Sequence, residues 1–166
     1  RALPRLEGSR VTHDLVDAAE RLARNKPGAI IVVEQEVGLD EYAQTGSAVD
    51  ARVSSEMLTT IFTPYSPLHD GAVLISGDVI KTAGAILPLT QSPVADRSLG
   101  TRHRAALGLS EETDAVVIVV SEETAQISVA MGGRLERDVD PERLRSILSG
   151  VLPDGEKPLR PAVTKG

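Results

Sequence analysis

Two separate runs of residues carry side chains that could bind a phosphorylated ligand. The first, residues 67–72, contains His-Asp-Gly-Ala and offers the carboxylate of Asp70. The second, residues 99–108, contains Gly-Thr-Arg-His-Arg and offers the guanidinium groups of Arg102 and Arg104 beside a hydroxyl. Carboxylates bind divalent cations, and guanidinium groups pair with phosphate oxygens. Together the two runs suit a metal-bound triphosphate.

Asp70 is followed by Gly71 and Ala72, which are small enough to let a sugar or phosphate approach the backbone closely. The Asp70 carboxylate can then hold a divalent cation against that ligand. Asp-Gly is also a common pair in hairpin turns, so the run by itself is more typical of a turn before a strand. It becomes informative only beside the second run.

The second run is expected at the start of a helix, with Thr101 as its cap. Arg102 and Arg104 then lie in the first turn, where positive side chains oppose the helix dipole. A bound phosphate would remove this conflict, because it pairs with the arginines and with the free backbone N–H groups. The alternative is a solvated basic patch that pairs with surface carboxylates.

Four further residues are candidates for the same site. We expect His103 to orient the loop through backbone groups rather than to act directly in catalysis. His69 is a candidate metal ligand. Ser121 and one of the two carboxylates after it, Glu122 or Glu123, end an apolar strand, at the position where α/β sheets present ligand-binding residues. A charged hairpin turn is the alternative, and the better one for Glu122.

The composition indicates one domain of the α/β class. The chain has 166 residues, of which 41% are hydrophobic, enough for one continuous core. Aromatic residues are limited to Tyr42, Phe62 and Tyr65. The core must therefore consist of Val, Ile, Leu and Ala, which is typical of a sheet covered by helices.

Charge and cysteine content exclude several function classes. A formal net charge of −6 and the scarcity of aromatic residues argue against nucleic acid as a partner. The absence of cysteine removes disulfides, thiolate nucleophiles and Cys-type zinc sites, and fits the cytoplasm. No apolar stretch reaches the ~20 residues that cross a bilayer, so a membrane contact would need a segment outside this chain.

Hydrophobic periodicity and turn residues predict the order of helices and strands. Helices are expected at residues 11–23, 54–62, 101–109 and 141–149, the last with Asp140 as its N-cap. Strands are expected at residues 29–34, 72–75, 79–87, 115–121, 126–131 and 134–137. The polar stretch 38–46 is expected to be irregular, and residues 153–166 to form a flexible tail.

Three motifs in this order and spacing resemble the diadenylate cyclase family, which joins two ATP molecules into cyclic di-AMP. They are Asp-Gly-Ala at 70–72, Gly-Thr-Arg-His-Arg at 100–104 and Ser-Glu-Glu-Thr at 121–124. The resemblance implies a mixed central sheet surrounded by helices, a catalytic domain at residues 11–152, and a homodimer in which each subunit holds one ATP. Within the family the chain looks closest to the membrane-tethered branch, so that residues 1–10 would be a linker from a membrane segment.

The resemblance also implies roles for individual residues. Asp70 would bind Mg²⁺ or Mn²⁺ together with His69 and Glu123, and would act in catalysis with Arg102 and Arg104. The residues expected to contact ATP are Gly71, Ala72, Leu87, Thr101, Arg102, His103, Arg104, Ser121 and Glu123. Ile86 stands where close relatives carry Tyr. A regulatory protein partner and a cytoplasmic domain anchored to the cell membrane would fit this branch.

Two other functions use the same residues. A metal-dependent phosphohydrolase would need no dimer, and its metal centre would be built by His69, Asp70, His103 and Glu123. A module that senses ATP or a cyclic dinucleotide without turnover is the third possibility, and the clustered arginines fit all three functions.

Overall fold

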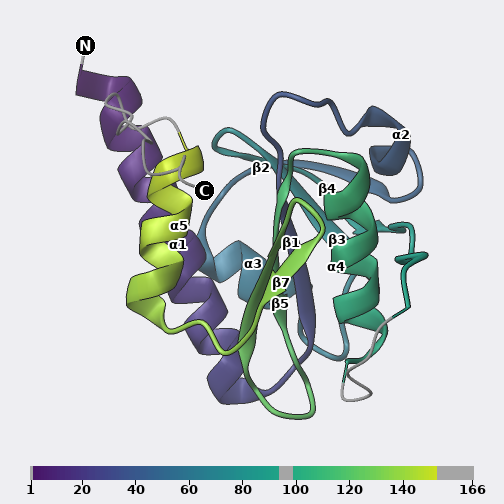
Figure 1. The fold of residues 1–166 in the computed structure, drawn as a ribbon. Coiled ribbons are helices and arrows are strands. Elements are labelled where there is room, and N and C mark those ends of the chain that lie inside the picture. The colour runs from purple at the N-terminus through teal and green to yellow at the C-terminus, as the bar shows by residue number, and fades with distance from the viewer. Residues whose placement is uncertain (1, 94–98, 153–166) are drawn as a thin grey trace.

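The protein folds into a seven-stranded mixed sheet with helices on both faces (Figure 1). The computed structural model of the chain describes residues 2–93 and 99–152, and for residues 2–9 it describes the backbone only. The helices are α1 (Ala2–Asn25), α2 (Asp40–Ala43), α3 (Ser55–Ile61), α4 (Thr101–Glu112) and α5 (Pro141–Val151). The strands are β1 (Ala29–Val33), β2 (Ser47–Arg52), β3 (Ala72–Ser76), β4 (Val79–Ala85), β5 (Val116–Val120), β6 (Ile127–Met131) and β7 (Arg134–Glu136).

The strand order in the sheet is β2-β4-β3-β1-β5-β6-β7. β1 and β3 pair in parallel, and the other neighbouring strands pair antiparallel. The expected α/β class with a mixed central sheet is therefore confirmed.

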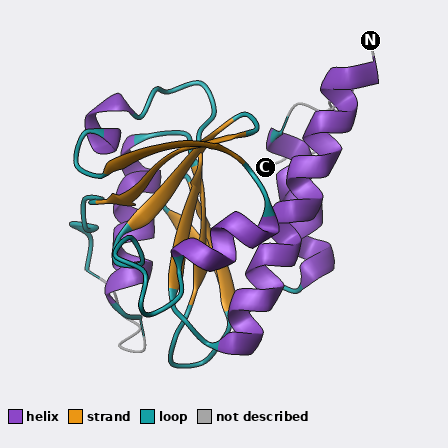
Figure 2. Cartoon of the chain, turned by 180° about the vertical axis from the view of Figure 1, so that it is seen from behind, coloured by secondary structure: helices purple, strands orange, loops and turns teal. Residues whose placement is uncertain are grey.

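Each face of the sheet has its own hydrophobic core, because side chains alternate between the faces along a strand. On β1, Ile31 and Val33 belong to the core beneath α1, α3 and α5. Ile30 and Val32 point the other way and pack in the core beneath α4. All five residues of β1 are buried, which explains why its sequence is a continuous apolar run. Figure 2 shows the sheet between these two layers of helices.

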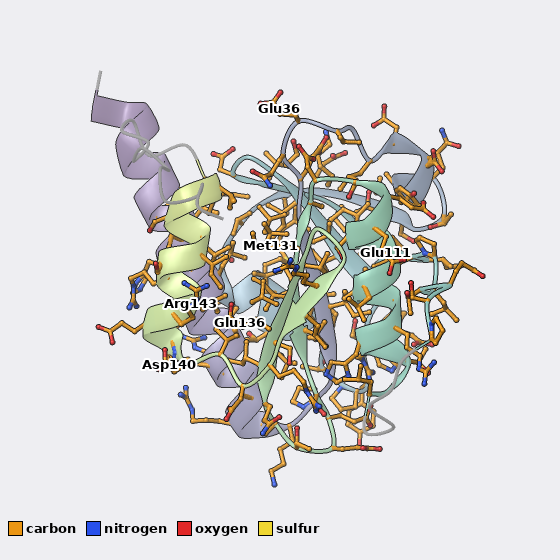
Figure 3. The ribbon with its side chains drawn as sticks, in the orientation of Figure 1. Glu36, Glu111, Met131, Glu136, Asp140 and Arg143 are labelled. Atoms are coloured by element: carbon orange, nitrogen blue, oxygen red, sulfur yellow. The ribbon has the colours of Figure 1, made fainter. Side chains whose placement is uncertain are left out.

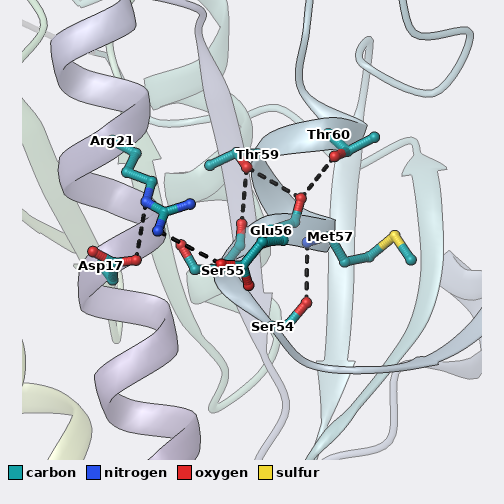
Figure 4. Close-up of polar contacts among 8 residues, drawn as sticks. All are labelled: Asp17, Arg21, Ser54, Ser55, Glu56, Met57, Thr59 and Thr60. Atoms are coloured by element: carbon teal, nitrogen blue, oxygen red, sulfur yellow. Dashed lines mark hydrogen bonds and ion pairs between the residues drawn. The ribbon is translucent and has the colours of Figure 1, made fainter.

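Polar contacts join α1 to α3 on the first face (Figure 4). Arg21 on α1 pairs with Asp17 one turn earlier at 3.1 Å and reaches Glu56 on α3 at 3.6 Å. Ser54 is the N-cap of α3, and its Oγ accepts a hydrogen bond from the backbone N–H of Met57 at 3.0 Å. These contacts fix the start of α3 against α1.

The last helix is also capped as expected. Asp140 Oδ1 accepts a hydrogen bond from the Arg143 backbone N–H at 2.8 Å, and Pro141 occupies the first helical position. Figure 3 shows Arg143 beside Glu136 on β7, and two hydrogen bonds of 2.9 and 3.0 Å join the two side chains. These bonds from the Arg143 guanidinium lower the pKa of Glu136. The pair connects α5 to the edge of the sheet.

Three local expectations differ from the structure. The stretch expected to be irregular contains the short helix α2, and the edge strand β2 follows it without having been predicted. β2 is mostly exposed and lacks the apolar alternation that marks a strand, so only its pairing with β4 defines it. Thr101 is the first residue of α4 rather than its cap, a position that Gly100 takes.

The expected domain boundaries lie near the two ends of the chain. Residues 2–10, expected to be a linker, are part of α1. Among the described helices, none has the length and apolar character needed to cross a bilayer. The expected tail at residues 153–166 lies outside the described residues.

Candidate active site

The directions of the strands bring both motifs to the same edge of the sheet, the one formed by strand ends rather than by an outer strand. β1 and β3 run parallel, so the residues that precede them, Gly28 and Asp70, lie at the same edge. β5 runs antiparallel to β1, and its last residue, Val120, pairs with Ala29. The turn that begins at Ser121 is thereby brought to this edge. In Figure 1 this is the lower edge, where α4 also begins.

A cavity of about 450 Å³ at this edge is lined by residues of both motifs. Its polar side chains are those of Asp70, Thr101 and Arg102. The remaining lining is Ile30, Gly71, Ala85, Ile86, Leu87, Leu89 and Ala105. An apolar cavity with a few polar groups at one end is typical of a small-molecule site.

A second cavity of about 210 Å³ adjoins the first, because Thr101 and Arg102 line both. Its other lining residues are Gly100, His103, Ser121, Glu122 and Glu123. The start of a helix with its free N–H groups, together with a guanidinium group and two hydroxyls, suits a phosphate chain. The two cavities thus meet at Thr101 and Arg102, and together they offer an apolar part and a polar part.

Arg102 lies at the junction of the two cavities and is held there from two sides. Its Nη1 donates a hydrogen bond to Glu122 Oε1 at 2.7 Å. Its guanidinium also passes directly over Gly28: a β-carbon added to Gly28 would lie 2.3 Å from Arg102 Cζ. The side chain is 30% exposed, so part of it remains open to the site.

His103 is buried, and its Nδ1 accepts a hydrogen bond from the Gly100 backbone N–H at 3.3 Å. In the neutral imidazole this contact puts the proton on Nε2. The contact spans the first turn of α4 and holds Gly100 against it. This geometry agrees with the expectation that His103 orients the loop, and its position on the second cavity also lets it face a ligand.

Three residues expected at the site do not line either cavity. Arg104 is two residues from Arg102 on α4, and residues at this spacing point to different sides of a helix. Ala72 is completely buried in β3, in the core beneath α4. His69 turns back onto its own loop, where its Nδ1 lies 2.8 Å from the carbonyl oxygen of Ser66.

The expected trio of metal ligands is not brought together. Among the described residues, no group of three His, Asp or Glu side chains is placed to hold an ion. Asp70 lines the first cavity, Glu123 lines the second, and His69 lines neither. The metal centre required by the phosphohydrolase alternative is therefore not assembled either. The physical reason is that His69, although adjacent to Asp70, contacts Ser66 in its own loop, and Glu123 lies on a different turn, after β5.

The donors that are present still fit a divalent cation that arrives with its substrate. Mg²⁺ is usually held by one or two carboxylates together with substrate phosphates and water. Asp70 is exposed, and no hydrogen bond or ion pair joins its carboxylate to another described residue. A carboxylate in this position can contribute to such a shared site.

Several lining residues were not identified from the motifs. Ile30, Ala85 and Ala105 belong to apolar elements that the sequence assigns to the core, and Leu89 lies in the segment after β4. Only the tertiary structure places these four residues on the cavity. Ile86 is 68% exposed, and its backbone N–H donates a hydrogen bond to Thr45 Oγ1 at 2.8 Å. The resemblance had already singled out Ile86, which stands where close relatives carry Tyr, and the structure places it on the cavity lining.

A family model decides the relationship of this chain to known proteins. The model described as DisA bacterial checkpoint controller nucleotide-binding, abbreviated DAC, matches residues 16–135. The chain belongs to the DAC family. The matched segment contains the first motif, the second motif and the turn after β5, which together line the two cavities.

Curated relatives of this DAC domain include diadenylate cyclases. One from Listeria monocytogenes is named diadenylate cyclase and is 49% identical, with 85% of this chain and 54% of the relative covered. One from Bacillus subtilis is named cyclic di-AMP synthase CdaA and is 45% identical, with 81% and 49% covered. The chain thus spans about half the length of these relatives.

Solved structures agree with the fold. A double mutant of DacA from Staphylococcus aureus superposes with a TM-score of 0.81 at 45% identity, covering 84% of this chain and 93% of that one. A Bacillus cereus protein described as a hypothetical membrane spanning protein has a TM-score of 0.73 at 47% identity, covering 76% and 62%.

Proposed function

We propose that this DAC domain is a diadenylate cyclase, which condenses two ATP molecules into cyclic di-AMP and releases two pyrophosphates. The observation that carries the proposal is the shared cavity of Asp70, Thr101 and Arg102, which continues along Arg102 into the cavity at the start of α4. The names of the Listeria and Bacillus relatives support the same reaction.

The apolar cavity takes the adenosine part of ATP. Leu87 and Ile86 border the base, and Gly71 leaves room for the ribose next to Asp70. The triphosphate extends into the second cavity, where Thr101, Arg102 and Ser121 are the donors. Free N–H groups in the first turn of α4 add to the attraction for phosphate. The backbone carbonyl oxygen of Arg104 accepts a hydrogen bond from the Thr90 N–H at 3.0 Å, and Ala72 is buried in β3, so these two residues support the loop and the strand behind this surface.

The reaction joins two nucleotides at two equivalent places. The 3′-hydroxyl oxygen of each ATP bonds to the α-phosphorus of the other, the bond from that phosphorus to the bridging oxygen breaks, and pyrophosphate leaves as the hydroxyl proton is released. Asp70 orients the hydroxyl and accepts its proton or passes it to water. Arg102 stabilises the charge that develops on the transferred phosphoryl group.

Mg²⁺ or Mn²⁺ would be held by Asp70 and substrate phosphates, with Glu123 as a further carboxylate on the second cavity. Such an ion supplies Lewis-acid stabilisation of the α-phosphate. The contact of His69 Nδ1 with the Ser66 carbonyl oxygen leaves Nε2 as the unprotonated ring nitrogen, and Nε2 is the atom through which His69 would join.

Catalysis requires two copies of the domain. Each copy has one such site, and a symmetric product needs two nucleotides in opposed, equivalent positions. A two-fold homodimer with the two sites facing each other provides this arrangement. Attachment to a membrane and control by a partner protein are further predictions for the longer protein.

The test is incubation of the domain with ATP and Mn²⁺, followed by chromatography of the nucleotide products at several protein concentrations. Cyclic di-AMP should form, and its rate per subunit should rise with protein concentration as dimers form. Release of ADP or AMP at a rate per subunit independent of concentration would favour a phosphohydrolase. ATP binding without any product, over a concentration range in which dimers are present, would favour a sensing module.

A further inference from the structure

We propose that Glu122 and Gly28 are positioning residues that together hold the Arg102 guanidinium at the junction of the two cavities. The inference rests on the proposed function, since it explains how Arg102 is aligned with the phosphate chain. Neither residue needs to contact the nucleotide.

Arg102 needs positioning because its side chain is long and flexible. Fixing such a side chain costs rotamer entropy, and a ligand that had to do so would bind more weakly. α4 itself provides only the backbone from which the side chain extends. The contacts that define its far end come from two other segments, the residue before β1 and the turn after β5.

Gly28 supplies the space. An added β-carbon would lie 2.3, 2.5 and 2.7 Å from Cζ, Nη1 and Nε of Arg102, so the guanidinium rests flat on the glycine. Gly28 is not in the left-handed region of φ, so its backbone conformation is open to alanine. Glycine is required here for the approach of Arg102. Alanine would therefore displace a flexible side chain and leave the backbone in place.

Glu122 sets the direction in which the Arg102 guanidinium points. Its Oε1 lies 2.7 Å from Arg102 Nη1, and it is the one described residue that hydrogen-bonds to this guanidinium. The group has five N–H donors, so the remaining donors can still face a ligand. A carboxylate beside a triphosphate would otherwise repel it. Pairing with Arg102 offsets this repulsion, which explains how the Glu122 carboxylate can line the second cavity.

The experiment measures binding of a non-hydrolysable ATP analogue by calorimetry, and cyclic di-AMP formation, in the same variants. Glu122→Ala and Gly28→Ala should each weaken binding by about tenfold, because the guanidinium loses its alignment. Glu122→Gln keeps an acceptor for Nη1 and should restore part of the loss. Thermal unfolding should remain close to that of the unmodified protein for the Glu122 variants, which change an exposed turn.

The decisive comparison uses Arg102→Ala as a background. If Glu122 and Gly28 act only through Arg102, neither substitution weakens binding further once the arginine is gone. A full additional loss in that background would show that Glu122 contacts the ligand or its metal directly, and would overturn the proposal. Unchanged binding in folded Glu122→Ala and Gly28→Ala proteins would overturn it too.

Two control variants make the same kinds of substitution outside the site: one removes a glutamate charge, and the other adds a β-carbon to a glycine. Glu136→Gln removes the charge from another Glu–Arg pair, neither member of which lines the two cavities, and Gly150→Ala adds a β-carbon where nothing lies within 4 Å. Both should bind the analogue normally. Because binding is read separately from turnover, absence of cyclic di-AMP with the unmodified protein would count against the proposed function and leave the positioning test intact.

Discussion

Asp70 and Arg102 face the same cavity, although one precedes β3 and the other lies in the first turn of α4. An acidic group and a basic group that share a cavity without pairing with each other are available to a ligand with both a cation and phosphates. The parallel pairing of β1 and β3 brings Asp70 to this edge, and Gly28 lets Arg102 lie across it.

The first prediction concerns Asp70. Asp70→Asn should reduce cyclic di-AMP formation at least a hundredfold, because the amide can neither accept the hydroxyl proton nor contribute charge to a cation site. Binding of a non-hydrolysable ATP analogue without added metal should change less than threefold, since Arg102 and the apolar lining remain. An unchanged turnover rate would remove Asp70 from the mechanism.

The second prediction concerns Ile86. This side chain is 68% exposed on the cavity rim and has no flat face for a base. Ile86→Tyr should tighten ATP binding by about fivefold or more, because stacking of a base on an aromatic ring is worth roughly 1–3 kcal/mol. Met131→Tyr, at an exposed position distant from the cavity lining, serves as the control and should leave ATP affinity unchanged. Equal affinities in all three proteins would contradict the assignment of the base to this rim.

The third prediction concerns Gly108 in α4. A β-carbon there would lie 2.0 Å from the carbonyl oxygen of Pro88, so the backbone of the cavity wall must move to admit it. Gly108→Ala should lower the free energy of unfolding by about 1–3 kcal/mol, despite the helix propensity of alanine. The shift of residues 87–89 should also weaken ATP binding. Chemical denaturation checks this against Gly150→Ala, which should be neutral or stabilising by up to ~1 kcal/mol.

The fourth prediction concerns alkaline pH. Tyr42 donates a hydrogen bond to Glu112, and this bond, with burial and the glutamate charge, raises the Tyr42 pKa to about 12. A folded pKa above the unfolded value means that the stabilisation is complete below about pH 10 and is lost as the pH rises through about 12. In a Tyr65→Phe background, ultraviolet absorbance reports Tyr42 alone, because the chain has two tyrosines. A midpoint near 10 in the folded protein would show that the hydrogen bond to Glu112 does not persist in solution.

Local sequence patterns were sufficient where an element depends on its own residues. The apolar run at β1, the helix that follows Ser54, the Asp140 cap and the helix after Gly100 were all predicted close to their observed bounds. β2 was not predicted, because an exposed edge strand has no apolar pattern and depends on its hydrogen bonds to β4.

The candidate site likewise combines features that the sequence predicts with features that only the tertiary structure decides. The residue types for binding phosphate and a cation, and their positions at the start of a strand and of a helix, follow from the sequence alone. Which of them meet was decided by the tertiary structure: helical geometry directs Arg102 into the cavity and Arg104 away, and the loop of His69 folds back on itself. Gly28 and Ile30 join the site only because strand order brings distant segments to one edge. Periodicity describes each segment by itself, whereas a binding surface depends on contacts between segments, which no local pattern encodes.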